Sequence, residues 1–212
     1  MYNTNMQNVI YIHGANASPD NFNYYLLKLP EHNSMLTTYS MDDDPFDIIE
    51  LIRLKKLREF NREPVTIIGH SFGGILAAWY ASVYPNNVKN LITVATPWHG
   101  TPVARIFGYF FRNAKIFKNT RPGADVLSLL QEKTFKGNHI NIVCTQGGNP
   151  VAGLGSHAND GMVSVDSQCG VPTNFKNSQN AYIEAGHSGV LLNNNATNLI
   201  IKTIFGDTNI NG

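Results

Sequence analysis

A glycine-rich turn around one serine constrains this chain more than any other feature. Residues 69–74 read GHSFGG and contain the pattern Gly-x-Ser-x-Gly. They follow an apolar run, residues 64–69, that predicts a buried strand, and they open a small-residue stretch, residues 72–84, that predicts a helix. A sharp strand-to-helix turn strains the backbone of the serine, so its neighbours must be small. The pattern predicts that the Ser71 hydroxyl stands above the end of a sheet, at a helix N-terminus that favours developing negative charge.

Short β-rich runs alternate with helical patterns along the rest of the chain. Further strands are predicted at residues 8–13, 35–40, 88–95, 140–145 and 181–184, and further helices at residues 45–60 and 188–204. Strands that are separated by helices imply βαβ units and a mostly parallel sheet. The chain of 212 residues therefore fits one α/β domain, with helices on both faces of the sheet.

Composition and charge exclude several other classes of protein. The formal net charge is +1, which removes an electrostatic case for a nucleic-acid partner. Cys144 and Cys169 are too few for a disulfide framework or a four-cysteine zinc site, and ordinary reduced thiols are expected. No run of carboxylates supports calcium, so neither a metal nor a cofactor is expected. Because no signal peptide or stretch of 18 apolar residues is visible, we expect a cytoplasmic protein without stable membrane insertion.

Five short motifs, taken in chain order, resemble those of the α/β-hydrolase superfamily, and within it the small bacterial lipases and esterases. The motifs are HG at residues 13–14, GHSFGG at 69–74, ATPWHG at 95–100, NDG at 159–161 and GHS at 186–188. The resemblance runs along nearly the whole chain. It implies the α/β-hydrolase fold and a serine hydrolase that cleaves carboxylic esters through an acyl-enzyme intermediate. The implied partner is a small acyl ester, lipid esters included.

A serine nucleophile needs a base, and the base needs an orienting acid. His187 follows the last predicted strand in a Gly-His-Ser-Gly loop, which points at the nucleophile in this fold, and His157 is its main competitor. Asp160 lies in an Asp-Gly-x-Val turn that resembles the acid turn of similar lipases, and Asp166 is the alternative. Ser71, Asp160 and His187 follow the chain order of the α/β-hydrolases.

Two backbone amides are expected to hold the oxyanion of the tetrahedral intermediate. One belongs to Phe72, the residue after the nucleophile, and the similar lipases imply Ala15, directly after His-Gly, as the other. Each such donor stabilises the transition state by roughly 2.7–4 kcal/mol. His13 is expected to support this loop. His70 is expected to pack within the strand-to-helix turn of residues 69–74, here called the elbow, rather than react.

Residues 96–137 break the alternation, because about forty residues pass without an obvious strand. Such an excursion inside a compact domain is usually functional. Its part 103–121 combines aromatic residues with five Lys or Arg and no acid. Two interpretations stay open. Residues 97–137 form a cap or lid whose Phe107, Phe110 and Phe111 line an acyl groove, or they form a helix pair that packs on the sheet.

Three functions remain compatible with these motifs. The first is ester hydrolysis. The second is acyl transfer or thioester cleavage by the same three side chains, since only the acceptor or leaving group differs. The third is a catalytically silent scaffold of the same fold that binds a ligand or partner. The sequence leaves the acyl chain length, the natural substrate and the oligomeric state open.

Overall fold

Six strands form one sheet in a computed structural model that describes residues 6–104, 115–149, 151–152 and 158–207. The strand order is β2-β1-β3-β4-β5-β6, and every neighbouring pair is parallel. The strands are β1 (Asn8–Ile12), β2 (Asn33–Leu36), β3 (Val65–His70), β4 (Val88–Val94), β5 (Phe135–Cys144) and β6 (Phe175–Ile183). The predicted α/β class with a parallel sheet is confirmed.

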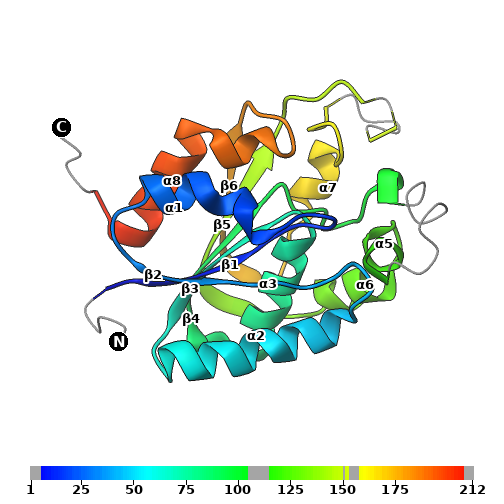
Figure 1. The fold of residues 1–212 in the computed structure, drawn as a ribbon. Coiled ribbons are helices and arrows are strands. Elements are labelled where there is room, and N and C mark those ends of the chain that lie inside the picture. Colours follow the sequence, from blue (N-terminus) through cyan, green and yellow to red (C-terminus); the bar gives the residue numbers. More distant parts are fainter. Residues whose placement is uncertain (1–5, 105–114, 150, 153–157, 208–212) are drawn as a thin grey trace.

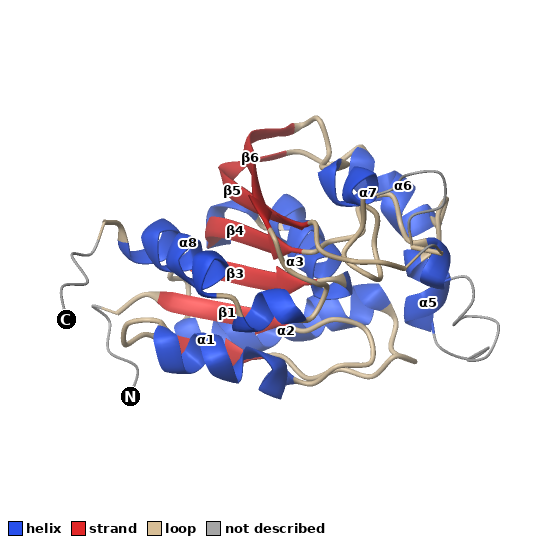
Figure 2. Cartoon of the chain, turned by 90° about the horizontal axis from the view of Figure 1, so that it is seen from above, coloured by secondary structure: helices blue, strands red, loops and turns tan. Residues whose placement is uncertain are grey.

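Helices cover both faces of this sheet (Figures 1 and 2). One face carries α2 (Pro45–Phe60), α3 (Phe72–Val83) and α6 (Asp125–Gln131), and the other carries α1 (Asn23–Lys28) and α8 (Asn194–Phe205). Two short helices, α5 (Lys115–Thr120) and α7 (Val165–Cys169), lie beyond the carboxyl ends of the strands (Figure 2). Within the part of the chain that the structure describes, no helix combines the length and apolar character that crossing a membrane requires.

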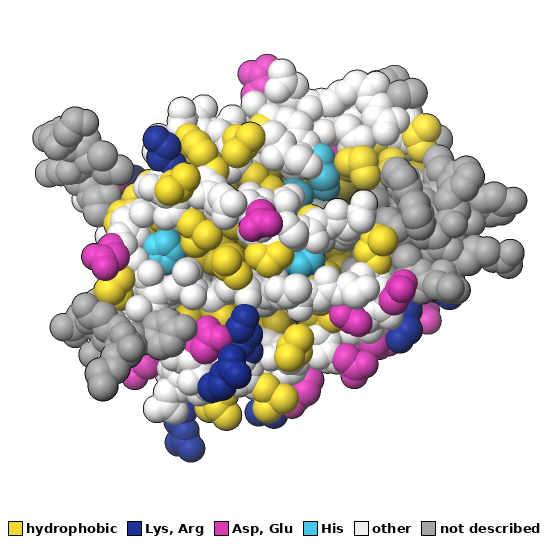
Figure 3. Space-filling model, in the orientation of Figure 1, with side chains coloured by type: hydrophobic (Ala, Val, Ile, Leu, Met, Phe, Trp, Pro, Cys, Tyr) yellow, Lys and Arg dark blue, Asp and Glu magenta, His cyan; other side chains and the backbone are white. Residues whose placement is uncertain are grey.

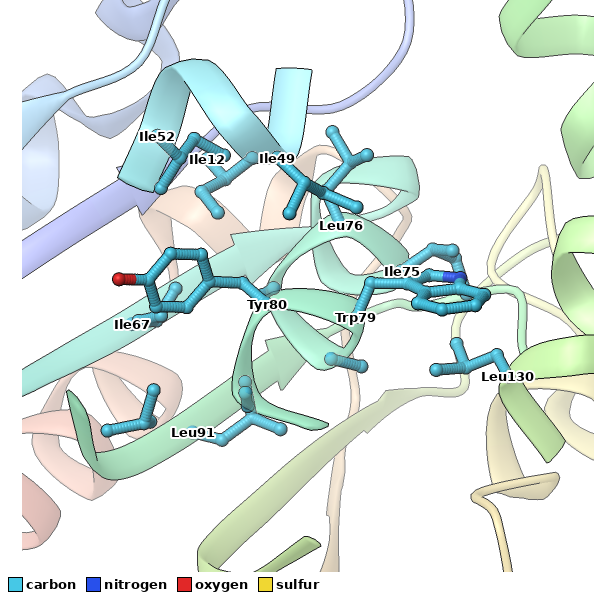
Figure 4. Packing of buried hydrophobic residues seen from close by; sticks show 14 of the residues in the cluster. Ile12, Ile49, Ile52, Ile67, Ile75, Leu76, Trp79, Tyr80, Leu91 and Leu130 are labelled. Atoms are coloured by element: carbon cyan, nitrogen blue, oxygen red, sulfur yellow. The ribbon is translucent and has the colours of Figure 1, made fainter. Parts of the chain in front are cut away.

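The alternation of side chains along the strands divides the core into two layers. In β1, Ile10 and Ile12 belong to the layer under α2 and α3, whereas Val9 and Tyr11 belong to the layer under α1 and α8. Figure 4 shows the first layer, where side chains of the strands meet those of α2 and α3. Because α3 lies buried between the sheet, α2 and α6, most of its residues are small or apolar.

The structure corrects several predicted bounds. The second strand is predicted at residues 35–40, but β2 ends at Leu36, because its partner β1 ends one residue after the Tyr11–Leu36 pair. Both β5 and β6 begin earlier than predicted, since each opens with a single buried phenylalanine, Phe135 or Phe175, and the residues that follow it are polar or glycine and form no continuous apolar run. The predicted helix 188–204 is two elements, η3 (Gly189–Leu192) and α8. Asn193 separates them by accepting hydrogen bonds from two amides of the first turn of α8.

The strand order places a crevice at one edge of the sheet. From β1 the chain runs outward to β2 and then returns across β1 to β3. Ligands of open parallel sheets bind at such a reversal, outside the carboxyl ends of the strands. His13 follows β1 and Ser71 follows β3, so the two loops that flank this crevice carry the residues that the sequence motifs select.

Candidate active site

Ser71 occupies the turn between β3 and α3 with φ 54° and ψ −123°. A side chain at positive φ costs of order 1–3 kcal/mol, so the surrounding contacts must enforce it. A Cβ atom on Gly69 would lie 2.4 Å from the carbonyl oxygen of Gly73, and one on Gly73 would lie 2.1 Å from that of Ile12. The Ser71 amide also donates to the carbonyl of Val94 at 2.8 Å. Close backbone contacts therefore require both glycines of the pattern.

Ser71 stands at one end of a chain of three hydrogen-bonded side chains. Its Oγ lies 3.0 Å from Nε2 of His187, and Nδ1 of His187 lies 2.7 Å from Oδ2 of Asp160. The structure thus brings together three residues that follow three different strands, β3, β5 and β6. In such an arrangement a neutral imidazole can take the proton of the hydroxyl while the carboxylate holds the ring.

Asp160 is buried, with 3% of its surface exposed, and hydrogen bonds fix both of its oxygens. Its Oδ1 accepts from the amides of Met162 at 2.9 Å and Val163 at 2.7 Å, and its Oδ2 faces His187. Asp166, the alternative acid of the sequence analysis, lies exposed in the first turn of α7. His187 therefore contacts Asp160 rather than Asp166. His157, the alternative base, lies outside the described residues.

Hydrogen bonds also hold the backbone of His187 in place. Its amide donates to the carbonyl of Asp160 at 2.8 Å, and its carbonyl accepts from Nε2 of His70 at 2.8 Å. His70 is buried directly before Ser71, and burial lowers the pKa of His70 to about 3, so the ring is neutral near pH 7. His70 therefore does more than pack in the elbow, because it anchors the loop that carries His187.

The loop after β1 lies against the elbow. A Cβ atom on Gly14 would come within 3.0 Å of the Ser71 Cβ. His13 braces this loop: its Nδ1 donates to the Gly14 carbonyl at 2.8 Å, and its ring stacks on Tyr39, whose hydroxyl donates to the His13 carbonyl. Within the described part of the chain, the amides of Ala15 and Phe72 are not paired with a backbone carbonyl of a turn or loop. Their assignment to an oxyanion hole stays a prediction.

A cavity of about 330 Å³ opens beside Ser71 and His187. Both predicted oxyanion donors line it. Much of the remaining lining is apolar and consists of Met41, Pro97, Val103, Ala104, Met162 and Val163. The first part of the predicted cap segment therefore forms a wall of this cavity.

The other residues of the cap segment that the structure describes, 115–137, pack on the domain. The helix α6 contributes Val126, Leu127 and Leu130 to the core beside α3. The Thr101 amide donates to the carbonyl of Thr120 at 2.9 Å, which closes the excursion on itself. The predicted groove residues lie outside the described residues, and these are Phe107, Phe110 and Phe111.

Gln168 of α7 supports the acid, and sequence analysis missed it. Its side chain is fully buried. Its Nε2 lies 3.2 Å from Oδ2 of Asp160 and 3.0 Å from the carbonyl of Cys144, while its Oε1 accepts from the Cys144 amide at 2.7 Å. Gln168 therefore ties the acid turn to the end of β5. A single glutamine in a helix of five residues has no periodicity that could have revealed it.

Two other features bear on the chemistry of the site. Both cysteines are free, and burial raises the pKa of the Cys144 thiol. Among the described residues, no group of three or more His, Cys, Asp or Glu side chains could hold a metal ion.

Comparisons with known proteins agree on the fold. A family model described as the alpha/beta hydrolase fold matches residues 28–112. A homoserine O-acetyltransferase of Thermus thermophilus is 36% identical over 78 residues, which cover 36% of this chain but only 20% of the transferase. A putative lipase from Acinetobacter baumannii AYE aligns with 95% of this chain and 83% of its own, at 18% identity and a TM-score of 0.60. A lipase-esterase related protein from Clostridium acetobutylicum aligns with 96% and 97%, at 14% identity and a TM-score of 0.63.

The parallel six-stranded sheet, the helices on both of its faces and these comparisons together identify an alpha/beta hydrolase-fold protein. The resemblance inferred from the sequence motifs is confirmed. Lipases and esterases are among its structural neighbours.

Proposed function

We propose that this protein is a serine hydrolase that cleaves carboxylic esters in the manner of a lipase or esterase. The observation that carries the proposal is the hydrogen-bonded chain from Ser71 through His187 to Asp160, beside a cavity at the carboxyl edge of the sheet. A nucleophile, a base and an orienting acid are the parts that acyl transfer to a serine requires. The lipase and esterase neighbours support the same reaction class.

The proposed reaction has two halves. Nε2 of His187 takes the proton of Ser71 as Oγ attacks the ester carbonyl carbon, and the same proton then passes to the leaving alcohol. The acyl group stays on Ser71 until a water molecule, deprotonated by His187, releases the acid. Asp160 holds the imidazole in the tautomer that accepts at Nε2. The amides of Ala15 and Phe72 donate to the oxyanion, and each contributes roughly 2.7–4 kcal/mol.

The substrate that fits best is a small acyl ester, lipid esters included. Val103, Ala104, Met162 and Val163 give one side of the cavity an apolar surface that suits an acyl chain. The cavity volume of about 330 Å³ is in the range of small-molecule pockets.

Acyl transfer is the second candidate, because the relative from Thermus thermophilus is named a homoserine O-acetyltransferase. The acyl-enzyme would be the same, and an alcohol would replace water as the acceptor. Thioester cleavage needs no other side chains. A catalytically silent scaffold is disfavoured, because the three side chains lie within hydrogen-bond distance of one another.

Labelling by a fluorophosphonate probe and turnover of p-nitrophenyl butyrate test the proposal. We expect Ser71→Ala to abolish labelling and to lower turnover by roughly 10⁴-fold or more. Ser82→Ala is the matched control, because this serine lies in the same helix region and its hydroxyl bonds the Trp79 carbonyl, away from the cavity. Labelling that persists in Ser71→Ala, or native protein without turnover, would contradict the proposed function.

A further inference from the structure

A second cavity, of about 280 Å³, lies at the opposite end of the sheet from Ser71. The C-terminal halves of α2 and α3 enclose it together with η2 (Pro85–Asn87), the short helix that leads into β4. The strands β3 and β4 begin near this cavity, whereas Ser71 follows the end of β3. The two cavities share no lining residue, so this one is separate from the site of the proposed reaction.

Every charged side chain that lines this cavity is basic, and these are Arg53, Lys56 and Arg62. Two hydrogen bonds pair Arg53 with Glu50, which compensates its charge. Arg62 is exposed and forms no ion pair within the part of the chain that the structure describes. On the face drawn in Figure 3, most charged side chains gather along α2, at the lower edge. The cavity therefore lies at the end of the most charged helix of this face.

Lys56 is buried, with 2% of its surface exposed, and its charge has no direct counterion among the described residues. Its Nζ donates to the carbonyl of Asn61 at 2.8 Å, and an ammonium group has two further donor hydrogens. Burial lowers the pKa of Lys56, and the Glu63 carboxylate opposes this effect without forming an ion pair. A buried charge without a paired counterion is costly, so an anion beside Lys56 would stabilise it.

Tyr80 lines the same cavity and has a hydroxyl without a hydrogen-bond partner, although the residue is completely buried. Figure 4 shows this hydroxyl pointing away from Trp79. Burial raises the pKa of Tyr80, and the nearby Asn87 opposes this effect without completing a hydrogen bond. Because buried polar groups in proteins are almost always paired, the free hydroxyl indicates an acceptor that enters the cavity.

Part of this arrangement has a structural role. The C-terminal ends of helices carry partial negative charge and unpaired carbonyls, and the bond from Lys56 to the Asn61 carbonyl satisfies one such group at the end of α2. That role uses neither Arg62 nor the Tyr80 hydroxyl. An oxyanion would supply a counterion to both basic side chains and an acceptor to the hydroxyl at the same time.

We propose that this cavity binds the phosphate group of a small phosphate monoester. A phosphate dianion presents several acceptor oxygens, which match the free donors of Lys56, Arg62 and Tyr80. A water molecule occupies about 30 Å³ of the liquid, so the cavity holds more atoms than a lone phosphate ion contains. The remainder of the ester packs against Leu57 and Tyr84, which give the cavity an apolar side. This site does not depend on the proposed function.

Calorimetric titration of the native protein tests this inference. Phenyl phosphate, inorganic phosphate and phenol are compared at pH 7.5 and constant ionic strength, where a phosphate monoester is mostly dianionic. We expect phenyl phosphate to bind several times more tightly than inorganic phosphate, because its ring contacts the apolar side of the cavity. We expect no measurable binding of phenol, which lacks the charge.

Two variants connect the binding to this cavity. Tyr80→Phe removes the hydroxyl and keeps the ring, so the Kd of phenyl phosphate should rise about tenfold, as for one hydrogen bond to a charged group. The melting temperature should not fall, because the hydroxyl has no partner to lose. Arg62→Gln should raise the same Kd severalfold and weaken its dependence on salt. Arg58→Gln is the matched control, because Arg58 is exposed near the end of the same helix but does not line the cavity.

Four outcomes would overturn the inference, in whole or in part. No binding of either phosphate compound at millimolar concentration would exclude the site. A Kd that neither Tyr80→Phe nor Arg62→Gln changes would mean an adventitious ion only, bound elsewhere. An equal effect of Arg58→Gln and Arg62→Gln would mean attraction to the general charge of α2. Inorganic phosphate that binds as tightly as phenyl phosphate would overturn the assignment to a monoester. Because ester turnover is not measured, failure of the proposed function would leave these results unchanged.

Discussion

His70 holds the backbone of His187 through one hydrogen bond from a buried, neutral ring. Its Nε2–H donates to the His187 carbonyl at 2.8 Å, while burial keeps the pKa of His70 at about 3. Removing this donor would leave a carbonyl of the histidine loop without its partner, at a cost of about 1–3 kcal/mol. The loop would then populate positions in which His187 no longer reaches Ser71.

At the residue scale we therefore predict a positioning role for His70. His70→Leu should lower kcat for p-nitrophenyl butyrate by roughly tenfold and leave KM nearly unchanged, because binding does not use the ring of His187. His70→Gln keeps an N–H donor and should recover most of the loss. Steady-state kinetics of the three proteins check this. Equal activity of the leucine and glutamine variants would show that only the packing volume of His70 matters.

At the scale of the element, α7 turns two polar side chains in opposite directions. Gln168 points inward, where it is fully buried and contacts Asp160 and the end of β5. Asp166 points outward and is exposed. This five-residue helix therefore connects the acid turn to the sheet, although none of its residues is hydrogen-bonded to Ser71 or His187.

A matched pair of variants tests α7. Gln168→Met preserves the length of the side chain but removes its hydrogen bonds to Asp160 and Cys144, so we expect kcat to fall roughly tenfold with little change in KM. Asp166→Asn should leave both constants unchanged. Steady-state kinetics on a p-nitrophenyl ester test both expectations, and the melting temperature of each variant shows whether its fold is intact. A large loss in Asp166→Asn would instead mark Asp166 as the acid.

Across the whole molecule, buried histidines make the stability depend on pH, and burial lowers the pKa furthest for His70 and His139. His139 is fully buried between β4 and β6, where its ring nitrogens bond Thr93 and Ser178 at 2.8 Å each. Burial lowers the pKa of His139 to about 3, as it does for His70. An unfolded histidine titrates near about 6.5, so the unfolded chain binds more protons than the folded one between roughly pH 3 and 6.5.

Because the unfolded chain binds these extra protons, lowering the pH in this range lowers the free energy of unfolding. The stabilising contribution of both histidines is complete above pH 6.5 and is lost as the pH falls below it, by up to about 1.4 kcal/mol per pH unit for each ring. Urea unfolding at pH 7.5, 6 and 5 should therefore show a falling free energy of unfolding. In His139→Gln the free energy of unfolding should depend less steeply on pH, because the contribution of one imidazole is removed. A slope that is unchanged in this variant would exclude His139 as a source.

The sequence by itself determined the elements whose causes are local. Asp44 caps α2 by accepting from the Phe46 amide at 3.0 Å, and Pro45 begins that helix, so the prediction of residues 45–60 is correct at both ends. Gly69 and Gly73 are required by the elbow they form, which made Ser71 predictable as its centre. Signals of this kind lie within a few residues of the feature they specify, and the chain order of the motifs identified the fold.

Only the tertiary structure decided the features whose causes are distant in the chain. The first halves of β5 and β6 are polar apart from Phe135 and Phe175, and they become strands because each pairs with a neighbouring strand. Gln168 meets Asp160 through the packing of α7 on β5, and His70 meets His187 across 117 positions of sequence. The cavity with the basic lining likewise needs α2 and α3 to lie side by side. The local periodicity of the sequence does not predict such contacts, because they depend on which strands the sheet places next to one another.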